Sequence, residues 1–315
     1  MGIVASMISE SFPPKSKFNV SDIPDLSGKV MIVTGGNTGV GKETVKALLQ
    51  HNAKVYLAGR SQDRCQTAIT DLKNETGKEA IFLRLDLGDL QSVKTAAAEF
   101  QSKEEQLHTL FNNAGVMVPP IDQLTAQSYD LQFGTNVLGH FYFTKLLLPT
   151  LLETAKAEPV FKARVVNTSS SASVMGSLNF ATFKDSPARQ KLGTQRLYAQ
   201  SKFGNVVVAQ ELTRRYGDQG LVSTSLNPGN LNSDLQRHLS SVVANVLSLI
   251  LYDVSYGALT QLWAGTSTEG ANFGGQYLIP WARQGKVGAQ AGSPEVGKEL
   301  WKWLDEQVEQ FEQSA

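Results

Sequence analysis

From residue 29 onward, the chain alternates short apolar runs, rich in β-branched residues, with longer amphipathic stretches. Runs of the first kind are typical of buried strands, and the longer stretches are typical of helices. When strands and helices alternate, each helix carries the chain back to a neighbouring parallel strand. The order therefore predicts an α/β fold: a doubly wound parallel sheet of the Rossmann type, in a single domain.

The expected elements follow one another without a dividing linker. Strands are expected at residues 29–34, 54–58, 80–85, 109–112, 164–168 and 222–226, with 276–279 as a candidate seventh. Helices are expected at residues 40–51, 61–74, 89–103, 124–153, 198–216, 254–267 and 294–312. We find no repeat or low-complexity tract. Residues 1–27 are therefore expected to form an N-terminal leader before one domain at 28–312.

Composition narrows the classes of ligand. Lys plus Arg equal Asp plus Glu at 29 each, so no overall charge favours nucleic acid or an anionic membrane. The single cysteine, Cys65, rules out an intramolecular disulfide, and the four histidines show no metal-ligand spacing. We therefore expect no metal and no nucleic-acid partner.

The N-terminus bears on location. It lacks the features of a secretory signal, and no run reaches the ~20 apolar residues of a membrane span. We therefore expect a cytoplasmic protein without a membrane span. Met1, Gly2 and Ser6 match the pattern for N-myristoylation, although a chance match in the leader is the alternative. A single acyl chain would anchor the protein only weakly.

A glycine-rich turn follows the first expected strand. In such turns, glycines allow a tight turn, a close approach of the backbone to a pyrophosphate, and close packing of helix on strand. Amide groups and the helix dipole then hold the phosphate charge. A turn that merely reverses the chain is the alternative. The residues expected at the cofactor are Gly35, Asn37, Thr38, Gly39, Val40 and Gly41.

The end of the second expected strand indicates which nicotinamide cofactor binds. An NAD enzyme would place an acidic residue there for the ribose 2′-hydroxyl, but this chain has Gly59 and Arg60. Arg60 can hold a 2′-phosphate through two charge-assisted hydrogen bonds. NADP(H) is therefore favoured, and a surface arginine without a ligand is the alternative.

Several motifs, in this order, resemble those of the short-chain dehydrogenase/reductase family over about residues 28–310. They are the glycine turn, Asp86-Leu87, Asn112-Asn113-Ala114-Gly115, Asn136, Val166-Asn167-Thr168-Ser169-Ser170, Tyr198-Ala199-Gln200-Ser201-Lys202 and Asn227-Pro228-Gly229. The layout is most similar to the branch of retinol dehydrogenases and protochlorophyllide reductases, which includes reductases of hydrophobic substrates.

Tyr198 and Lys202 lie one turn apart on an expected helix and therefore share a face. Lowering the pKa of a phenol from its usual ~10 to about 7 requires roughly 4 kcal/mol of preference for the phenolate. The Lys202 ammonium and an oxidised nicotinamide are candidate sources. Tyr198 would give a proton to a carbonyl oxygen in reduction and remove it from an alcohol in oxidation. A chance Tyr-x-x-x-Lys pattern on a helix surface is the alternative.

Two further residues complete the expected catalytic set. Ser170, at the end of the fifth expected strand, would hydrogen-bond the same substrate oxygen, with Ser169 as the main rival and Ser171 less favoured. The resemblance implies that Lys202 binds the nicotinamide ribose and that Asn136 supports a proton-relaying water. A structural role in capping or satisfying backbone groups is the alternative for Asn136.

The resemblance also implies the remaining cofactor contacts. Asp86 would meet the adenine amino group, and Leu87 would offer a backbone contact. Leu231 would face the nicotinamide carboxamide, and Ser233 stands where the family commonly has threonine. The other residues expected near the cofactor are Asn113, Ala114, Gly115, Pro228 and Gly229, together with Tyr198 and Lys202.

Two long links follow strand ends, where ligands bind in open α/β sheets. Residues 229–253 include the apolar stretch 239–252, which could line a substrate pocket or form a packed helix or an oligomer contact. In residues 171–197 we expect the apolar side chains to cover a hydrophobic substrate and the charged side chains to lie on a solvated face. The alternative is that the segment is only a surface loop. The apolar ones are Phe180, Phe183 and Leu192, and the charged ones are Lys184, Asp185 and Arg189.

These features favour an NADP(H)-dependent oxidoreductase that interconverts a carbonyl and an alcohol on a fairly apolar small molecule. The resemblance adds a role in secondary metabolism. The alternative is a catalytically idle NADP(H)-sensing or interaction protein, against which the intact Ser170, Tyr198 and Lys202 set argues. A serine hydrolase is disfavoured because no G-x-S-x-G motif is present. The oligomeric state stays open.

Overall fold

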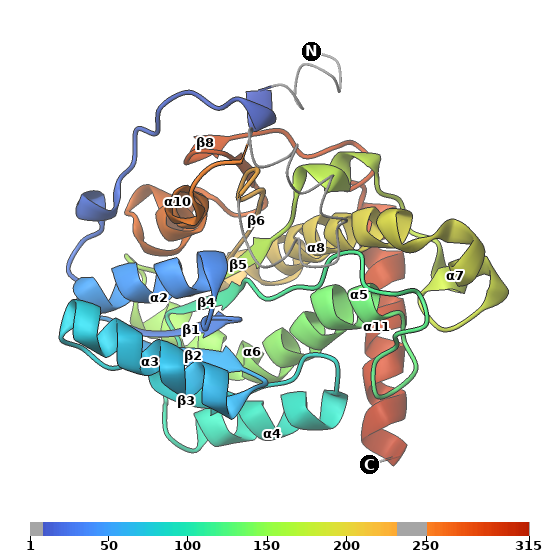
Figure 1. The fold of residues 1–315 in the computed structure, drawn as a ribbon, viewed down its shortest axis with the longest axis horizontal. Coiled ribbons are helices and arrows are strands. Elements are labelled where there is room, and N and C mark those ends of the chain that lie inside the picture. Colours follow the sequence, from blue (N-terminus) through green and yellow to red (C-terminus); the bar gives the residue numbers. More distant parts are fainter. Residues whose placement is uncertain (1–8, 232–250, 315) are drawn as a thin grey trace.

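The computed structural model describes residues 9–231 and 251–314. They form one eight-stranded sheet with the order β3-β2-β1-β4-β5-β6-β7-β8, parallel throughout except for the antiparallel pair β7 and β8 (Figure 1). The predicted single doubly wound α/β domain is confirmed. The strands are β1 (Val30–Thr34), β2 (Lys54–Gly59), β3 (Ile81–Arg84), β4 (Thr109–Asn112), β5 (Arg164–Thr168), β6 (Val222–Leu226), β7 (Tyr277–Ile279) and β8 (Arg283–Gln284).

Helices cover both faces of the sheet. The α-helices are α2 (Gly39–Gln50), α3 (Gln62–Thr76), α4 (Leu90–Gln101), α5 (Leu131–Phe133), α6 (His140–Ala157), α7 (Pro187–Leu192), α8 (Thr194–Tyr216), α10 (Val254–Thr266) and α11 (Pro294–Ser314). A π-helical turn, η2 (Gly134–Gly139), joins α5 to α6. Short 3-10 helices are η1 (Val20–Asp22), η3 (Ser171–Met175), η4 (Phe180–Thr182), η5 (Gly217–Gln219) and η7 (Glu269–Asn272).

The first strand shows why the sheet needs two helical layers. Every residue of β1 is buried. Ile32 packs into the core formed with α4, α6 and α8, whereas Met31 and Val33 pack into the core formed with α2, α3 and α10. A strand buried on both faces has a nearly continuous apolar sequence rather than an alternating one. The carboxyl ends of the central strands are left free of helix and form the edge where the site lies.

Two elements differ from the sequence-based expectation. The helix expected at 124–153 begins only at Leu131, because the Asp130 side chain accepts hydrogen bonds from the first amides of α5 and Leu124 bridges back to Asp130. The short strand β8 was not predicted. Its two residues carry no recognisable strand pattern and follow β7 through a tight reversal.

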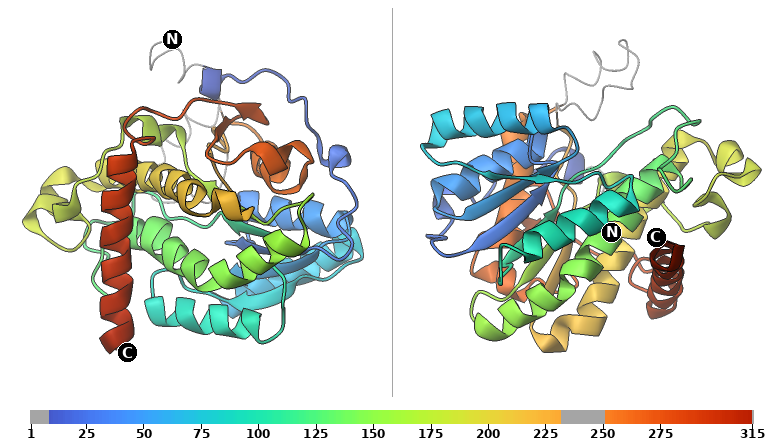
Figure 2. Two further views of the ribbon diagram at one scale, coloured as in Figure 1. Left: turned by 180° about the vertical axis from the view of Figure 1, so that it is seen from behind. Right: turned by 90° about the horizontal axis from the view of Figure 1, so that it is seen from below.

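The chain ends pack on this domain in different ways. Phe18, Ile23 and Leu26 are buried in the core beside α2 and α10. At the other end, α11 runs across the outer side of α6 and α8, and the Lys145 ammonium on α6 pairs with Asp305 at 2.7 Å (Figure 2). The expected myristoylation pattern, Ser233 and nearly all of the stretch 239–252 lie outside the described residues.

Candidate active site

A cavity of about 1390 Å³ lies at the carboxyl ends of the parallel strands. Its walls come from the glycine turn after β1, from Gly59 and Arg60 after β2, and from the segments that follow β3, β4, β5 and β6. Every described residue that the sequence analysis places at the cofactor lines this cavity, as do Ser170, Tyr198 and Lys202. Asn136 lies behind the wall, and Ser233 is outside the described residues.

The glycine turn leaves room for a backbone-bound phosphate. Gly35 and Gly39 have φ values of +66° and +54°, which favour glycine. A side chain at Gly41 would overlap the carbonyl oxygen of Gly35 and the Asn113 amide. Because α2 begins at Gly39, its unpaired N-terminal amides lie at the cavity. This arrangement fits an anionic group such as a pyrophosphate.

Thr34 joins the turn after β1 to the turn after β4, and the sequence analysis did not identify it. Its hydroxyl oxygen accepts hydrogen bonds from the amides of Asn113 and Ala114, both at 2.9 Å. The same hydroxyl lies 2.9 Å from Nε2 of the buried His140, whose Nδ1 lies 3.1 Å from the carbonyl oxygen of Asn136. That carbonyl can only accept, so Nδ1 carries a proton. Burial lowers the pKa of His140 to about 4.

The strand end at β2 is basic. Arg60 is exposed and lines the cavity together with Arg64, which sequence reasoning missed. Asp71, which also lines the cavity, pairs with Lys42 at 2.7 Å. A 2′-phosphate on an adenosine ribose would therefore meet two arginines at this strand end.

Tyr198 and Ser170 both line the cavity. Burial raises the pKa of Tyr198 to about 12, and the interaction with the Ser170 side chain acts in the opposite direction. The ammonium of Lys202 lies 5.9 Å from the centre of the Tyr198 ring and donates to the carbonyl oxygen of Thr168 at 3.0 Å. Burial lowers the pKa of Lys202 to about 8, which still leaves it mostly charged at neutral pH.

The geometry separates the two neighbouring serines. Ser169 is buried and donates its hydroxyl to the carbonyl oxygen of Lys202 at 2.7 Å, so its hydroxyl is engaged by the backbone. Ser170 accepts from the amide of Ala172 at 3.2 Å and also meets Tyr198. This arrangement favours Ser170 over Ser169 as the serine that reaches a substrate.

The side chain of Asn136 is held by the protein itself. Its Oδ1 accepts from the amide of Val116 at 2.8 Å, and its Nδ2 donates to the carbonyl oxygen of Val116 and to the Ser201 hydroxyl, both at 3.0 Å. The side chain thus satisfies backbone groups and ties the turn after β4 to α8, which is the structural role given as the alternative for Asn136. A water relay through Asn136 stays a prediction.

Comparison with known proteins agrees with this geometry. A family model described as "short chain dehydrogenase" matches residues 29–243. A short-chain dehydrogenase/reductase from Armillaria gallica is 61% identical over 99% of this chain and 100% of its own length. The chain belongs to the short-chain dehydrogenase/reductase family. It is an oxidoreductase by family, as the sequence predicted.

Solved structures share the fold of this short-chain dehydrogenase/reductase. A protein from Mycobacterium paratuberculosis has a TM-score of 0.69 at 27% identity and covers 93% of this chain and 97% of its own. The NADP complex of Pseudomonas aeruginosa RhlG has a TM-score of 0.65 at 22% identity, over 81% of this chain and 95% of its own. The second likeness concerns the fold alone.

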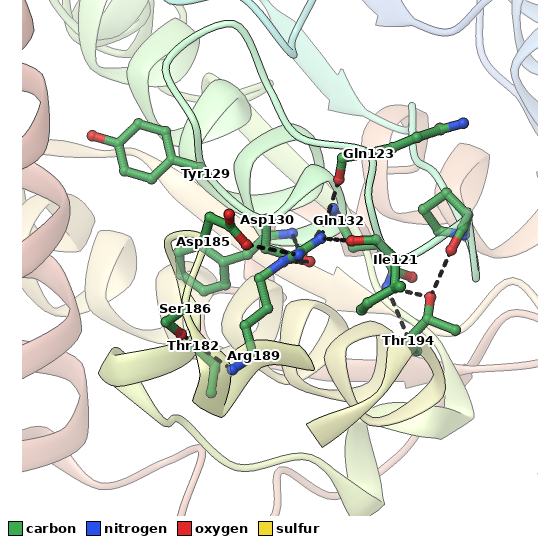
Figure 3. A network of polar contacts seen from close by, with 12 residues as sticks. Ile121, Gln123, Tyr129, Asp130, Gln132, Thr182, Asp185, Ser186, Arg189 and Thr194 are labelled. Carbon is green, nitrogen blue, oxygen red and sulfur yellow. Dashed lines mark hydrogen bonds and ion pairs between the residues drawn. The ribbon is translucent and has the colours of Figure 1, made fainter. Parts of the chain in front are cut away.

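The segment between β5 and α8 corrects two expectations (Figure 3). Arg189 is not on a solvated face: it is 2% exposed, and its Nε donates to Asp130 at 2.9 Å. Its Nη2 donates to the carbonyl oxygens of Ile121 and Gln123, at 2.5 and 3.1 Å. Phe183 does not cover a substrate, because it is fully buried and stacks on Phe133 with ring centres 3.7 Å apart. Lys184 and Asp185 are exposed as expected.

The apolar wall next to Tyr198 comes mainly from other residues. Met175 on η3 is 67% exposed and lines the cavity, and the turn after β4 adds an apolar run at 116–118. That run, directly after the Asn-Asn-Ala-Gly motif, was the signal in the sequence that could have identified this wall. The apolar lining residues outside the predicted cofactor contacts include Val116, Met117, Val118, Leu124, Leu131, Ala172, Met175 and Leu251.

Two features are absent from the described residues. None of the helices in the described ranges is long and apolar enough to cross a membrane. Within the same ranges, no group of three or more His, Cys, Asp or Glu side chains could hold a metal ion.

Proposed function

We propose that this short-chain dehydrogenase/reductase uses NADP(H) to interconvert a carbonyl and an alcohol on a fairly apolar small molecule, with Tyr198 as general acid and base. One observation carries the proposal: Ser170, Tyr198 and Lys202 line the same cavity, and the Lys202 ammonium lies 5.9 Å from the centre of the Tyr198 ring. A protein that only sensed the nucleotide would not need this arrangement. The idle alternative is therefore not favoured.

In the reductive direction, the cofactor would supply a hydride to the carbonyl carbon when bound. Ser170 holds the carbonyl oxygen by a hydrogen bond, and Tyr198 gives that oxygen its proton as negative charge develops. Lys202 lies close enough to stabilise the resulting phenolate, which burial alone disfavours. Oxidation runs the same proton transfer in reverse.

The cofactor assignment rests on the two ends of its site. The glycine turn and the start of α2 fit the pyrophosphate. Arg60 and Arg64 fit a 2′-phosphate, which favours NADP(H) over NAD(H). The apolar wall that includes Met175 supports an apolar substrate. Secondary metabolism, the retinol-dehydrogenase-like branch and a cytoplasmic location stay predictions.

Replacement of Tyr198 tests the mechanism. Wild-type protein should consume NADPH with members of a panel of apolar ketones and aldehydes. Tyr198→Phe should lower kcat by about 100-fold or more, because general acid catalysis contributes about that much. The affinity of this variant for NADPH, measured by fluorescence titration, should equal that of the wild-type protein.

Tyr216→Phe is the matched control, since it removes a phenol from the far end of the same helix. It should leave turnover unchanged. If Tyr198→Phe were as active as the control, Tyr198 would be excluded as the acid. If the wild-type protein bound NADPH but turned over no substrate, the catalytically idle alternative would be favoured.

A further inference from the structure

Residues 9–11 form a helical turn that lies beside β8, although they precede the region matched by the family model (Figure 1). Arg283 on β8 holds this turn by donating to the carbonyl oxygen of Ser9 at 2.8 Å and to its hydroxyl at 3.2 Å. The next side chain, Glu10, is 2% exposed. A buried carboxyl group is costly unless polar groups satisfy it, so its partners indicate its role.

One partner of Glu10 is the turn after β6. The Asn227 side-chain amide donates to Glu10 Oε2 at 2.9 Å, and Oδ1 of Asn227 accepts from the amide of Gly229 at 3.0 Å. Gly229 lines the cavity and has φ +96°, and a side chain there would collide with the ring of Trp281. Glu10 therefore holds the side chain that shapes a tightly built turn of the cavity wall.

The other partner is Tyr277 on β7. Its hydroxyl donates to the carbonyl oxygen of Ser170 at 3.3 Å and also interacts with the carboxyl group of Glu10 and with the Ser173 hydroxyl. Burial and Glu10 raise the pKa of Tyr277 well above its usual range, so the phenol keeps its proton and can donate. This chain of contacts leads from Glu10 to the backbone of the serine that meets Tyr198.

The chemistry of the two partners suits a carboxyl group. The Asn227 amide donates an N–H to Glu10, and the single O–H of Tyr277 is shared between Glu10 and the carbonyl oxygen of Ser170. A carboxylate has two oxygens that only accept, so it suits both partners. The side-chain oxygen of a glutamine could accept from one of these two donors, but its NH2 group would then face the other donor. An aliphatic residue would leave buried donors unpaired.

We propose that Glu10 is a positioning residue for the reaction: through Asn227 and Tyr277 it holds the strand ends that carry Ser170 and Gly229. The proposal rests on the oxidoreductase function proposed above. It makes the segment before the family region part of the catalytic unit.

Turnover kinetics test the proposal. Glu10→Ala should lower kcat about tenfold, because small displacements of catalytic groups are costly in rate. Glu10→Gln should recover part of that loss. Tyr277→Phe should lower kcat too. In the Glu10→Ala/Tyr277→Phe double variant, the loss in kcat should be smaller than the product of the two single losses, because the two residues act through the same contact. Binding of 2′,5′-ADP, a probe of the adenosine end alone, should be unchanged in every variant.

Hydrogen exchange read by mass spectrometry gives a second readout that needs no substrate. Glu10→Ala should speed exchange in peptides covering 169–173 and 226–230, but not in the glycine turn at 35–41. Lys17→Gln, an exposed change in the same segment, is the control for both readouts.

Three results separate the outcomes. If Glu10→Ala had the same kcat and the same hydrogen-exchange rates as Lys17→Gln, the proposal would be overturned. Faster exchange throughout the sheet with loss of 2′,5′-ADP binding would assign Glu10 to stability alone and overturn it too. If wild-type protein turns over no substrate, the proposed oxidoreductase function fails, and the exchange experiment still decides whether Glu10 holds the two strand ends.

Discussion

We expect single side chains at the strand ends to decide which cofactor the cavity accepts. Arg60→Gln removes a charge from the basic end of the cavity and leaves Arg64 in place. A charge-assisted hydrogen bond contributes about 1.5–3 kcal/mol, so we expect NADPH to bind roughly 10- to 100-fold more weakly. NADH binding should be unchanged, because NADH has no 2′-phosphate. Fluorescence titration with each cofactor measures both effects.

Arg84→Gln provides the control, since Arg84 is an exposed arginine at the end of β3 that does not line the cavity. It should bind both cofactors as the wild type does. A wild-type protein that prefers NADH would refute the argument from Arg60.

The sequence predicts those residues whose roles depend on local spacing, and it misses those whose roles depend on contacts between distant parts of the chain. Tyr198, Lys202 and the glycine turn depend on local spacing along one element, and the sequence contains that spacing. The choice between Ser169 and Ser170 depends on which hydroxyl the backbone of Lys202 engages. Thr34 and His140 lie more than 100 positions apart along the chain, so no local pattern could have joined them.

At the scale of elements, the segment between β5 and α8 is a fixed wall. The Arg189 guanidinium ties it to Asp130, the cap of α5, and to the turn after β4 (Figure 3). Trp303 on α11 packs edge-on against Phe183 from the opposite side, with ring centres 4.9 Å apart. The segment is therefore held from both sides, and we expect it to shape the substrate end without opening as a lid.

Breaking the buried ion pair should test this anchor. Arg189→Met leaves Asp130 buried without its cation, and removal of one partner of a buried pair costs about 3–5 kcal/mol. The free energy of unfolding, measured by urea denaturation, should fall by that amount. The double variant Asp130→Asn/Arg189→Met should recover part of the loss because no charge stays unpaired.

The control for this pair is Arg196→Met, an exposed arginine near the start of α8. If Arg189→Met were as stable as that control, the ion pair would not anchor the segment.

The elements themselves were predictable to unequal degrees. Strands β1, β5 and β6 are buried along their whole length, and the nearly continuous apolar run of β1 gives its position without further information. The start of α5 was missed because Asp130 both caps the helix and pairs with a residue from a later segment. Arg189 was misplaced for the same reason: a charged residue predicts exposure unless its partner is known.

At the scale of the whole molecule, buried His140 links stability to pH. Burial lowers its pKa to about 4 in the folded protein, from the ordinary 6.5. As pH falls from 6.5 toward 4, the unfolded chain takes up a proton that the folded protein refuses, so folding stability falls. The difference corresponds to about 3 kcal/mol.

His140→Gln should therefore show a shallower loss of unfolding free energy over that pH range, whatever its stability at neutral pH. His51→Gln changes a histidine that is not buried and should keep the wild-type slope. Equal slopes for all three proteins in urea denaturation at several pH values would contradict this account of His140.

The two ends of the chain differ in how close they come to the chemistry, and this bears on how the protein is best produced. Glu10 contacts Asn227 after β6, whereas no residue of α11 lines the cavity, and the C-terminal end of α11 lies on the side of the molecule opposite the turn at 9–11 (Figure 1). An affinity tag or fusion partner joined ahead of residue 9 could disturb the docking of that turn. A tag after α11 leaves the docking undisturbed, and activity assays should use protein purified in that form.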